Sequence, residues 1–318
     1  MTGDLTRESV PARQPAPQAK STPEHRRGER DRVMAMLERR LSEALGLCGG
    51  LLRSPSLSLR LLSTLPFVLR GAKFSRRWSA VDEKHALPLS REGQEPGVPH
   101  NALRSYFESH REGPGIWKWV HYFEAYHRHL SRFVGREVHV LEIGVYSGGS
   151  LPMWREYFGP QCHVYGVDIE EACRVYENEW TSVSIGDQAD RRFWKRFKQE
   201  HPRIDVLIDD GGHEPEQQLV TLEEMLPHLR PGGVYICEDV HGERNRFNAY
   251  VHGVAANLNT CLPKPGDQSK GIACSPTDFQ AAIHSVHMYP FLTVLEKHDL
   301  PVAEFSSQKH GTEWQPFL

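Results

Sequence analysis

Two pairs of carboxylates stand where two apolar runs of this sequence end. The run IDVLIDD ends on Asp209 and Asp210, and the run GGVYICED ends on Glu238 and Asp239. If these runs are neighbouring parallel strands, their carboxyl ends bring all four acids to one edge of a sheet. Crowded carboxylates raise one another's pKa unless a cation neutralises them, and oxygen ligands favour a hard ion, Mg²⁺ before Ca²⁺ or Mn²⁺. The pattern therefore predicts a divalent metal site.

The expected metal ligands are Asp209, Glu238 and Asp239, with Asp210 either a ligand or a neighbour of the ligands. The alternative is that some of these acids only cap the helices that follow, a role that suits Asp210 and Glu214. Zinc would call for Cys or more His than this corner offers.

The elements that must position these acids follow an alternating pattern. Five short β-rich runs alternate with segments of helical periodicity, which predicts a doubly wound, mostly parallel sheet with right-handed crossovers. The runs are residues 138–145, 162–169, 181–187, 204–210 and 232–239. Residues 285–299 and 301–306 read as two late strands with no helix between them, so we expect them to form an antiparallel pair. Residues 117–133 carry an aromatic stripe at helical spacing, which is typical of a core helix but could also close over a ligand.

The first strand ends in EIGVYSGGS, a glycine-rich turn before a helix. Gly144 and Gly148 would let the backbone approach a ligand closely, and the helix N-terminus would favour an anionic group. Asp168 follows 24 residues after Gly144 and could accept hydrogen bonds from ribose hydroxyls, which predicts a nucleoside-containing cofactor. The GxGxxG pattern of nicotinamide-binding proteins does not fit, because Tyr146 replaces its second glycine. The alternative is a tight turn that binds no ligand.

Taken in order, EIGVYSGG, GVDI, IGDQAD, IDDGGHEPEQQ and GGVYICEDVH resemble the successive motifs of class I S-adenosylmethionine-dependent methyltransferases. Within that class the chain is similar to the metal-dependent O-methyltransferases of macrolide sugars, of the mycinamicin type, over about residues 117–297. The resemblance implies a Rossmann-like α/β fold with a seven-stranded sheet and an antiparallel C-terminal hairpin. It also implies S-adenosyl-L-methionine as cofactor and Mg²⁺ at the acidic corner.

The resemblance also implies roles for individual residues. Asp168 would hold the ribose, and Asp187 with Gln188 would lie near the adenine, although Asp187 could instead cap the next helix. Many members of the family have glycine where this chain has Tyr146, which puts the cofactor's carboxylate contact in doubt. The residues expected at the methionine end are Glu142, Gly144, Tyr146 and Gly148.

Methyl transfer to an alcohol requires removal of the hydroxyl proton. Coordination to a divalent ion lowers the pKa of the hydroxyl, and a base then takes its proton. By its match to the family motif His241 is the better candidate for the base, and His213 would orient substrate or ligand, or else be a loop residue bonded to backbone. We therefore predict a Mg²⁺-assisted O-methyltransferase acting on a small-molecule hydroxyl, such as a sugar or natural-product diol. The alternatives are an oxidoreductase or hydroxylase-like relative, or a membrane-peripheral scaffold with a relic fold.

The N-terminal quarter of the chain differs in charge from the rest. The 318 residues have a net charge of −3, yet residues 1–80 carry 15 Lys and Arg against 7 Asp and Glu. We predict a disordered tail over residues 1–23, a helical basic extension and linker over 24–113, and the methyltransferase domain over 114–318. Within the extension, residues 24–47 have helical periodicity, and leucines alternate with arginines over residues 45–77. That second stretch suits either packing on the main domain or weak contact with an anionic membrane surface.

The cysteine pattern, the apolar runs and the net charge indicate which partners and which cellular compartment to expect. The six cysteines form no CxxC pair, and the sequence shows neither a secretory signal nor 18 consecutive apolar residues. We therefore expect a reducing, cytoplasmic setting, with membrane-peripheral contact left open. The whole-chain charge gives no signature of nucleic-acid binding. The sequence leaves a homo-oligomer open.

Overall fold

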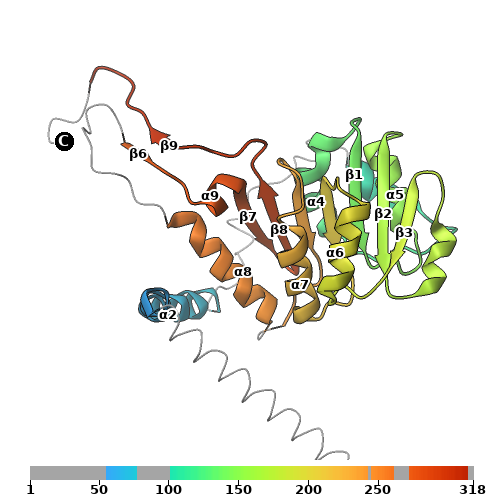
Figure 1. Cartoon of the computed structure of the whole chain (residues 1–318), viewed down its shortest axis with the longest axis horizontal. Helices are drawn as coiled ribbons and strands as arrows, with labels where there is room; N and C mark the ends of the chain where they lie inside the picture. Colours follow the sequence, from blue (N-terminus) through green and yellow to red (C-terminus); the bar gives the residue numbers. More distant parts are fainter. Residues whose placement is uncertain (1–54, 77–100, 243–244, 261–271, 314–318) are drawn as a thin grey trace, which may run out of the picture. The chain divides into compact units, whose positions relative to one another are not determined.

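The computed structural model describes residues 55–76, 101–242, 245–260 and 272–313 (Figure 1). The chain divides into two compact units, residues 1–89 and residues 90–318. The predicted tail over residues 1–23 and the predicted helix over 24–47 lie outside the described residues.

In the first unit the described residues form one helix, α2 (Pro55–Ser75). It contains no acidic residue, and Lys73 lies in its last turn. Its described side chains, residues 62–76, are exposed. No helix among the described residues is long and apolar enough to cross a membrane.

The second unit is built on a seven-stranded sheet. Its strands are β1 (Val138–Ile143), β2 (Cys162–Asp168), β3 (Thr181–Ile185), β4 (Val206–Asp209), β5 (Val234–Cys237), β7 (Ile283–Tyr289) and β8 (Leu292–Lys297). Their order is β3-β2-β1-β4-β5-β8-β7, with β1 to β5 parallel and β7 and β8 antiparallel. The predicted Rossmann-like fold with an antiparallel C-terminal hairpin is confirmed.

Helices cover both faces of this sheet, as Figure 1 shows for α6 and α7 in front of it and α5 behind it. The elements are α3 (Ala102–Ser109), α4 (Tyr122–Leu130), η2 (Ser131–Phe133), α5 (Ser150–Phe158), η3 (Glu171–Tyr176), α6 (Arg191–Glu200), α7 (Pro215–Met225), α8 (Arg246–Ala256), η4 (Asn257–Asn259) and α9 (Asp278–Ala282). Side chains alternate across each strand, so Val140 packs with the α3, α4 and α5 cluster and Leu141 packs with the α6, α7 and α8 cluster. Both faces of the parallel strands are therefore buried.

The hairpin comes from a shorter stretch of sequence than we expected. Residues 285–299, predicted as one strand, contain most of β7 and all of β8, and the chain reverses at Pro290 and Phe291. The predicted partner, residues 301–306, is not in the main sheet. Its last residues enter β9 (Phe305–Ser307), which pairs with β6 (Ile272–Cys274) in a separate two-stranded sheet. Pro290, which cannot donate to a strand ladder, was the signal of this turn that the prediction did not use.

The segment predicted to link the two parts contains a helix of the second unit. Leu103 of α3 is fully buried in the same cluster as α4 and α5. Asn101 caps α3 by accepting from the Arg104 N–H, and its Nδ2 donates to the Phe123 carbonyl at 2.7 Å. Residues 102–109 thus pack as part of the second unit, ahead of the boundary expected at residue 114.

Candidate functional site

A cavity of about 870 Å³ opens at the carboxyl ends of the parallel strands. The chain runs from β1 outward to β2 and β3, and later returns to β4 on the other side of β1, so the strand order reverses at β1. Ligands of open α/β sheets bind at such a reversal. Of the predicted site residues, the lining includes Gly144, Tyr146, Asp168, Asp187, Gln188, Asp210, His213, Glu238, Asp239 and His241.

Glycine is required at the turn that follows β1. Gly144 has a φ of +90°, and a Cβ there would lie 2.0 Å from the Asp210 carbonyl oxygen. A side chain is therefore excluded where the β1 turn meets the end of β4. Gly148 also has a positive φ, and a Cβ on it would lie 2.7 Å from the ring of Tyr176. Gly148 is not among the cavity-lining residues, so its contribution is to the shape of the turn.

Asp168 ends β2 with its carboxylate fixed at the cavity wall. Its Oδ2 accepts the Tyr146 N–H at 3.0 Å, and its Oδ1 accepts the Glu170 N–H at 3.0 Å. Each oxygen keeps a lone pair, because a carboxylate oxygen can accept two hydrogen bonds. The Tyr146 backbone is left-handed (φ 48°) and its side chain is exposed, so this departure from glycine turns the ring toward the cavity mouth.

Two residues expected beside the cofactor have their polar atoms engaged by the protein. Glu142 is fully buried behind the cavity lining, where its Oε2 accepts from the Ser150 hydroxyl at 2.7 Å. Burial raises the pKa of Glu142. Gln188 donates to Asp209 and accepts from the Gly212 N–H at 2.8 Å. Both side chains therefore support the loops around the cavity.

Asp187 remains at the cavity surface and does not cap the next helix. It is exposed, and its Oδ1 accepts the Ala189 N–H at 2.8 Å. The cap of α6 is Asp190, which accepts from the Arg192 N–H. Helix capping, the other role considered for Asp187, is thus performed by Asp190, three positions later in the chain.

The structure separates the four acids of the predicted metal corner into two groups. Asp210, Asp239 and His213 each offer a ligand atom, and these atoms all lie within 4.8 Å of one another. The His213 Nε2 lies 3.8 Å from Asp210 Oδ1 and 3.6 Å from Asp239 Oδ2. These distances are too long for hydrogen bonds, and they suit atoms that share an ion between them.

The other oxygen of each of these two carboxylates is held by protein donors. Asp210 Oδ2 accepts from the Lys118 ammonium at 2.5 Å. Asp239 Oδ1 accepts from Trp119 Nε1 at 2.8 Å and from the Tyr122 hydroxyl at 2.9 Å. Donors in such positions orient metal ligands. The arrangement can therefore present one oxygen of each acid to a hard cation.

Asp209 and Glu238, two of the three metal ligands that we expected, accept hydrogen bonds from protein donors. The observed set of candidate ligands therefore differs from the expected one. Asp209 does not line the cavity, and it accepts from Gln188 Nε2 and from the Tyr235 hydroxyl. Burial raises its pKa to about 6. Glu238 lines the cavity, but its Oε1 accepts from the Tyr126 hydroxyl at 2.6 Å, and burial followed by the Asp210 charge raises its pKa to about 8. Asp209 is thus a supporting residue of the corner.

A buried lysine that the sequence analysis did not identify lies among these acids. The Lys118 Nζ is 2.5 Å from Asp210, 3.0 Å from Glu238 and 3.4 Å from Glu142, and its side chain is 2% exposed. Burial alone would lower the pKa of Lys118, but the charges of Asp210, Glu238 and Glu142 raise it well above its usual range. One positive charge therefore faces three acidic side chains.

The aromatic stripe over residues 117–133 is divided between core and cavity. Tyr122 and Tyr126 are fully buried, as expected of a core helix. Trp117 and Trp119 precede α4, remain 86% and 50% exposed, and line the cavity. Both interpretations of the aromatic stripe are therefore correct for part of it, because the tyrosines of α4 pack in the core and the tryptophans before α4 line the cavity. Lys118 between the tryptophans is the signal that could have been noticed, because a lone charge within an aromatic run requires a partner if it is buried.

His241, the predicted base, lies at the rim of the cavity. It is exposed, and its ring centroid is 5.9 Å from that of Phe291. It does not belong to the group formed by Asp210, Asp239 and His213. His213 has a left-handed backbone (φ 57°) and a buried Nδ1 without a hydrogen-bond partner. The structure therefore places one histidine within the acidic corner and one beside it.

Comparison with known proteins agrees with the fold. Residues 141–240 match the family described as "Methyltransferase domain". The chain is 36% identical over 218 residues to the 8-demethyl-8-alpha-L-rhamnosyl tetracenomycin-C 2'-O-methyltransferase of Streptomyces olivaceus, covering 64% of this chain and 55% of the relative. It is 40% identical over 182 residues to the L-olivosyl-oleandolide 3-O-methyltransferase of Streptomyces antibioticus, covering 55% and 44%. The chain thus spans about half the length of these curated relatives, or less.

A solved structure gives the same result for the architecture. The mycinamycin-pathway methyltransferase MycE, in complex with Mg and SAH, is similar with a TM-score of 0.50 and 26% identity over 62% of this chain and 54% of MycE. Residues 141–240 therefore match a methyltransferase domain, and the fold around them is Rossmann-like, as the sequence motifs indicated.

The charge of Lys118 should be important for stability. In Lys118→Met the buried acids lose their cation, so we expect the free energy of unfolding to fall by about 3 kcal/mol in EDTA at neutral pH. Denaturant unfolding measures this change. The matched control is Lys195→Met, an exposed position on α6 where the change should stay within about 0.5 kcal/mol. Equal stability of the two variants would contradict a structural role for the ammonium.

The raised pKa of Asp209 should appear in the pH dependence of stability. Its pKa of about 6 in the folded protein exceeds the usual 3.8, so the folded protein holds this proton more tightly than the unfolded chain does. The resulting stabilisation is complete below the lower value and is lost as the pH rises through the upper one.

Asparagine cannot ionise, so the stability of Asp209→Asn does not fall through this titration. Its free energy of unfolding should therefore rise relative to that of the wild type by up to about 3 kcal/mol as the pH increases from about 4 to about 7. Denaturant unfolding in EDTA over that range measures the difference in free energy of unfolding. A difference that does not change with pH would show that Asp209 does not titrate there.

Proposed function

We propose that this chain is an S-adenosylmethionine-dependent, Mg²⁺-assisted O-methyltransferase that acts on a hydroxyl of a glycosylated small molecule. One observation carries the proposal. The fixed Asp168 carboxylate and the Asp210, Asp239 and His213 group open into the same cavity. A nucleoside cofactor and a metal-bound alcohol could therefore be held side by side, as methyl transfer between them requires.

The relatives support the cofactor, the metal and the class of acceptor. MycE was solved with Mg and SAH, and the two curated relatives are named as O-methyltransferases of sugars attached to tetracenomycin C and oleandolide. The family match over residues 141–240 includes most of the residues that line the cavity. That this chain has the activity of these relatives is our proposal, since it covers about half of each of them.

On the cofactor side the proposed roles follow from the contacts. Asp168 would accept hydrogen bonds from the ribose hydroxyls through the lone pairs that its backbone donors leave free. Gly144 allows the β1 turn to approach the methionine part without a side chain in the way. Asp187 at the surface would face the adenine. We no longer assign direct contacts to Glu142 and Gln188, because their polar atoms support the surrounding loops.

On the acceptor side the donor set fits a hard divalent ion. The ligand atoms would be one oxygen each of Asp210 and Asp239 together with the His213 ring, and Glu238 could add an oxygen from the cavity wall. Bound Mg²⁺ would lower the pKa of a coordinated hydroxyl and fix the acceptor's orientation. Two adjacent hydroxyls of a sugar could chelate such an ion, which is why a vicinal diol is the acceptor we favour.

The residues around the corner would complete the reaction. His241 at the rim would accept the hydroxyl proton, leaving His213 as a ligand. The apolar rim suits an acceptor whose sugar is attached to a large apolar group, because exposed apolar surface at a cavity mouth favours such a ligand. That rim consists of Trp117, Trp119, Tyr146, Ile169 and Val175.

The cofactor assignment is tested by calorimetry with S-adenosylmethionine. Asp168→Ala should weaken binding by about 10-fold to 100-fold, the loss of hydrogen bonds to a charged acceptor. Glu171→Gln is the control, because Glu171 is near in sequence, pairs with Arg174 and does not line the cavity. Absence of cofactor binding to the wild-type chain, or unchanged binding in Asp168→Ala, would overturn the proposal.

A second set of variants within the same test distinguishes the residues that bind the metal from the residue that acts as the base. With rhamnosylated tetracenomycin C as the probe acceptor, methyl transfer should require Mg²⁺ and stop in EDTA. Asp239→Asn and His213→Ala should lose Mg²⁺ affinity, whereas His241→Ala should keep the affinity and lose turnover. Turnover that survives both EDTA and Asp239→Asn would refute the metal mechanism and leave the cofactor assignment standing.

We further propose weak contact of residues 45–77 with an anionic membrane surface. Support comes from α2, which has no acidic residue and carries Arg70 and Lys73 beside exposed apolar side chains. The exposed apolar residues are Leu62, Leu65, Phe67, Val68, Leu69 and Phe74. The chain should sediment with phosphatidylserine-containing vesicles and less with phosphatidylcholine vesicles. The double variant Arg70→Glu/Lys73→Glu should remove the difference, and equal sedimentation with both lipids would contradict the contact.

A further inference from the structure

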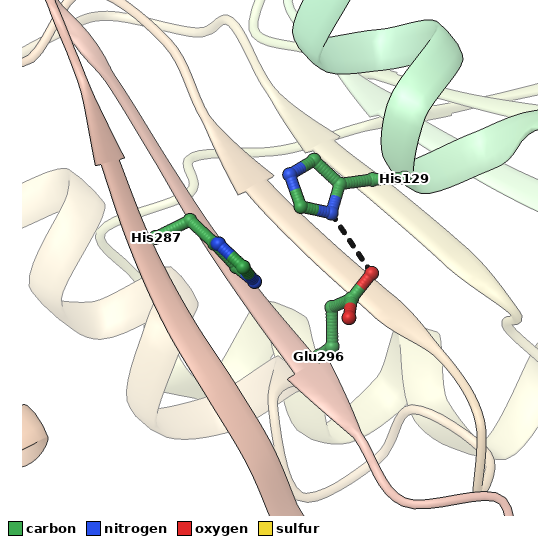
Figure 2. A group of neighbouring side chains, drawn as sticks. All are labelled: His129, His287 and Glu296. Atoms are coloured by element: carbon green, nitrogen blue, oxygen red, sulfur yellow. Dashed lines mark hydrogen bonds and ion pairs between the residues drawn. The ribbon is translucent and has the colours of Figure 1, made fainter.

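A second group of metal-ligand side chains lies outside the cavity, where α4 crosses the β7–β8 hairpin. His129 comes from the last turn of α4, His287 from β7 and Glu296 from β8 (Figure 2). One ligand atom of each lies within 4.8 Å of the others. Among the described residues this group and the Asp210 group are the two that have such spacing.

We propose that His129, His287 and Glu296 bind one Zn²⁺-class ion at a site separate from the acidic corner. Two imidazole nitrogens and one carboxylate oxygen form a ligand set that selects zinc or a similar transition metal over Mg²⁺. The acidic corner offers mainly oxygen and selects a hard ion. The two sites should therefore discriminate between metals.

The geometry of His129 supports coordination through its Nδ1. The side chain is 3% exposed, and its Nδ1 lies 2.9 Å from Glu296 Oε1. Its Nε2 lies 2.9 Å from the Tyr289 hydroxyl. An ion between Nδ1 and Glu296 would replace one hydrogen bond, and the Nε2–H could continue to donate to Tyr289. A ligating histidine commonly has such a second partner, which fixes its tautomer and ring orientation.

His287 completes the set from the neighbouring strand. Its ring centroid is 4.6 Å from that of His129, which brings the two imidazoles to one side of Glu296. Its Nε2 contacts the Ser285 hydroxyl at 2.9 Å, and that hydroxyl lies 3.3 Å from Glu296 Oε2. Rotation of the serine hydroxyl would free the nitrogen, and water could fill the fourth position of a tetrahedral ion.

Two further cationic or titratable groups face Glu296. Arg132 Nη2 is 3.9 Å from Glu296 Oε1, and His284 Nδ1 is 3.8 Å from Oε2. Arg132 also donates to the Gly232 carbonyl at 2.8 Å, and its side chain is 40% exposed. Its charge is therefore partly screened by solvent, and it keeps a partner when an ion neutralises Glu296.

An ion at this site would fix the helix that shapes the candidate active site. Tyr122, Tyr126 and His129 lie at i, i+4 and i+7 on one face of α4. The first two donate to Asp239 and Glu238, and the third contacts Glu296. The metal would therefore anchor the C-terminal end of a helix whose N-terminal half holds two acids of the corner. This role does not depend on methyl transfer.

The test uses the full chain with the acidic corner disabled by Asp210→Asn/Asp239→Asn. Titration with Zn²⁺ by calorimetry, and with Co²⁺ by visible d–d absorption, should detect one site with nitrogen ligands. Adding His287→Ala or Glu296→Gln should weaken that site at least 10-fold and remove the Co²⁺ spectrum. The matched control is His252→Ala, an exposed histidine of α8, which should change neither readout.

Folding and binding are distinguished within the same set of variants. Glu296→Gln keeps the volume of the side chain and an oxygen that accepts from His129, so it tests coordination even if His287→Ala fails to fold by circular dichroism. Absence of a Zn²⁺ site in the corner-disabled chain would overturn the proposal. Unchanged affinity and spectrum in folded Glu296→Gln would also overturn it, as would an equal loss in His252→Ala.

Discussion

The buried ammonium of Lys118 is the interaction around which the candidate site is arranged. A buried carboxylate is stable only if a cation or hydrogen-bond donors compensate its lost hydration. Lys118 contacts Glu142, Asp210 and Glu238 together, and so fixes the segment before α4 to the ends of β1, β4 and β5. One ammonium cannot neutralise three acids and the adjacent Asp239. The remaining negative charge would favour the divalent cation that we propose there. Burial, followed by the Asp210 charge, raises the pKa of Glu238.

The sheet order explains why this charge lies beside the cavity. Because β1 lies between β2 and β4, the glycine turn, Asp168 and the acidic ends of β4 and β5 open on one side of the sheet. The close approach of Gly144 to the Asp210 carbonyl fixes the distance between the two halves of the cavity. A proposed methyl donor and a proposed metal-bound acceptor would therefore be positioned by the backbone before either binds, which lowers the entropic cost of their encounter.

Helix α4 connects this cavity to the edge of the sheet. Its tyrosines hold Asp239 and Glu238, and His129 in its last turn contacts Glu296 of β8. Movement of α4 relative to the β7–β8 hairpin would therefore change the contacts of the tyrosines and the contact of His129 together. The position of the helix thus couples the acidic corner to the proposed zinc-class site.

The sequence by itself determined the alternating elements, the cavity at the strand ends and several residues that line it. Periodicity and strand endings are local properties, so Gly144, Asp168, Asp210, Asp239 and His213 could be placed in one region from their spacing alone. The late hairpin was assigned to the wrong stretch, because residues 285–299 were interpreted as one strand although Pro290 marks a break within them.

Only the tertiary structure decided which partners each acid has. Asp209 and Asp210 are adjacent in the chain, yet the first accepts from Gln188 and Tyr235, and the second faces His213 and Lys118. Lys118 precedes Asp210 by 92 residues and Glu238 by 120, and His129 precedes Glu296 by 167. Contacts at such separations depend on the packing of α4 and its preceding loop against the sheet. No periodicity in the sequence encodes them, because they arise where separately formed elements meet.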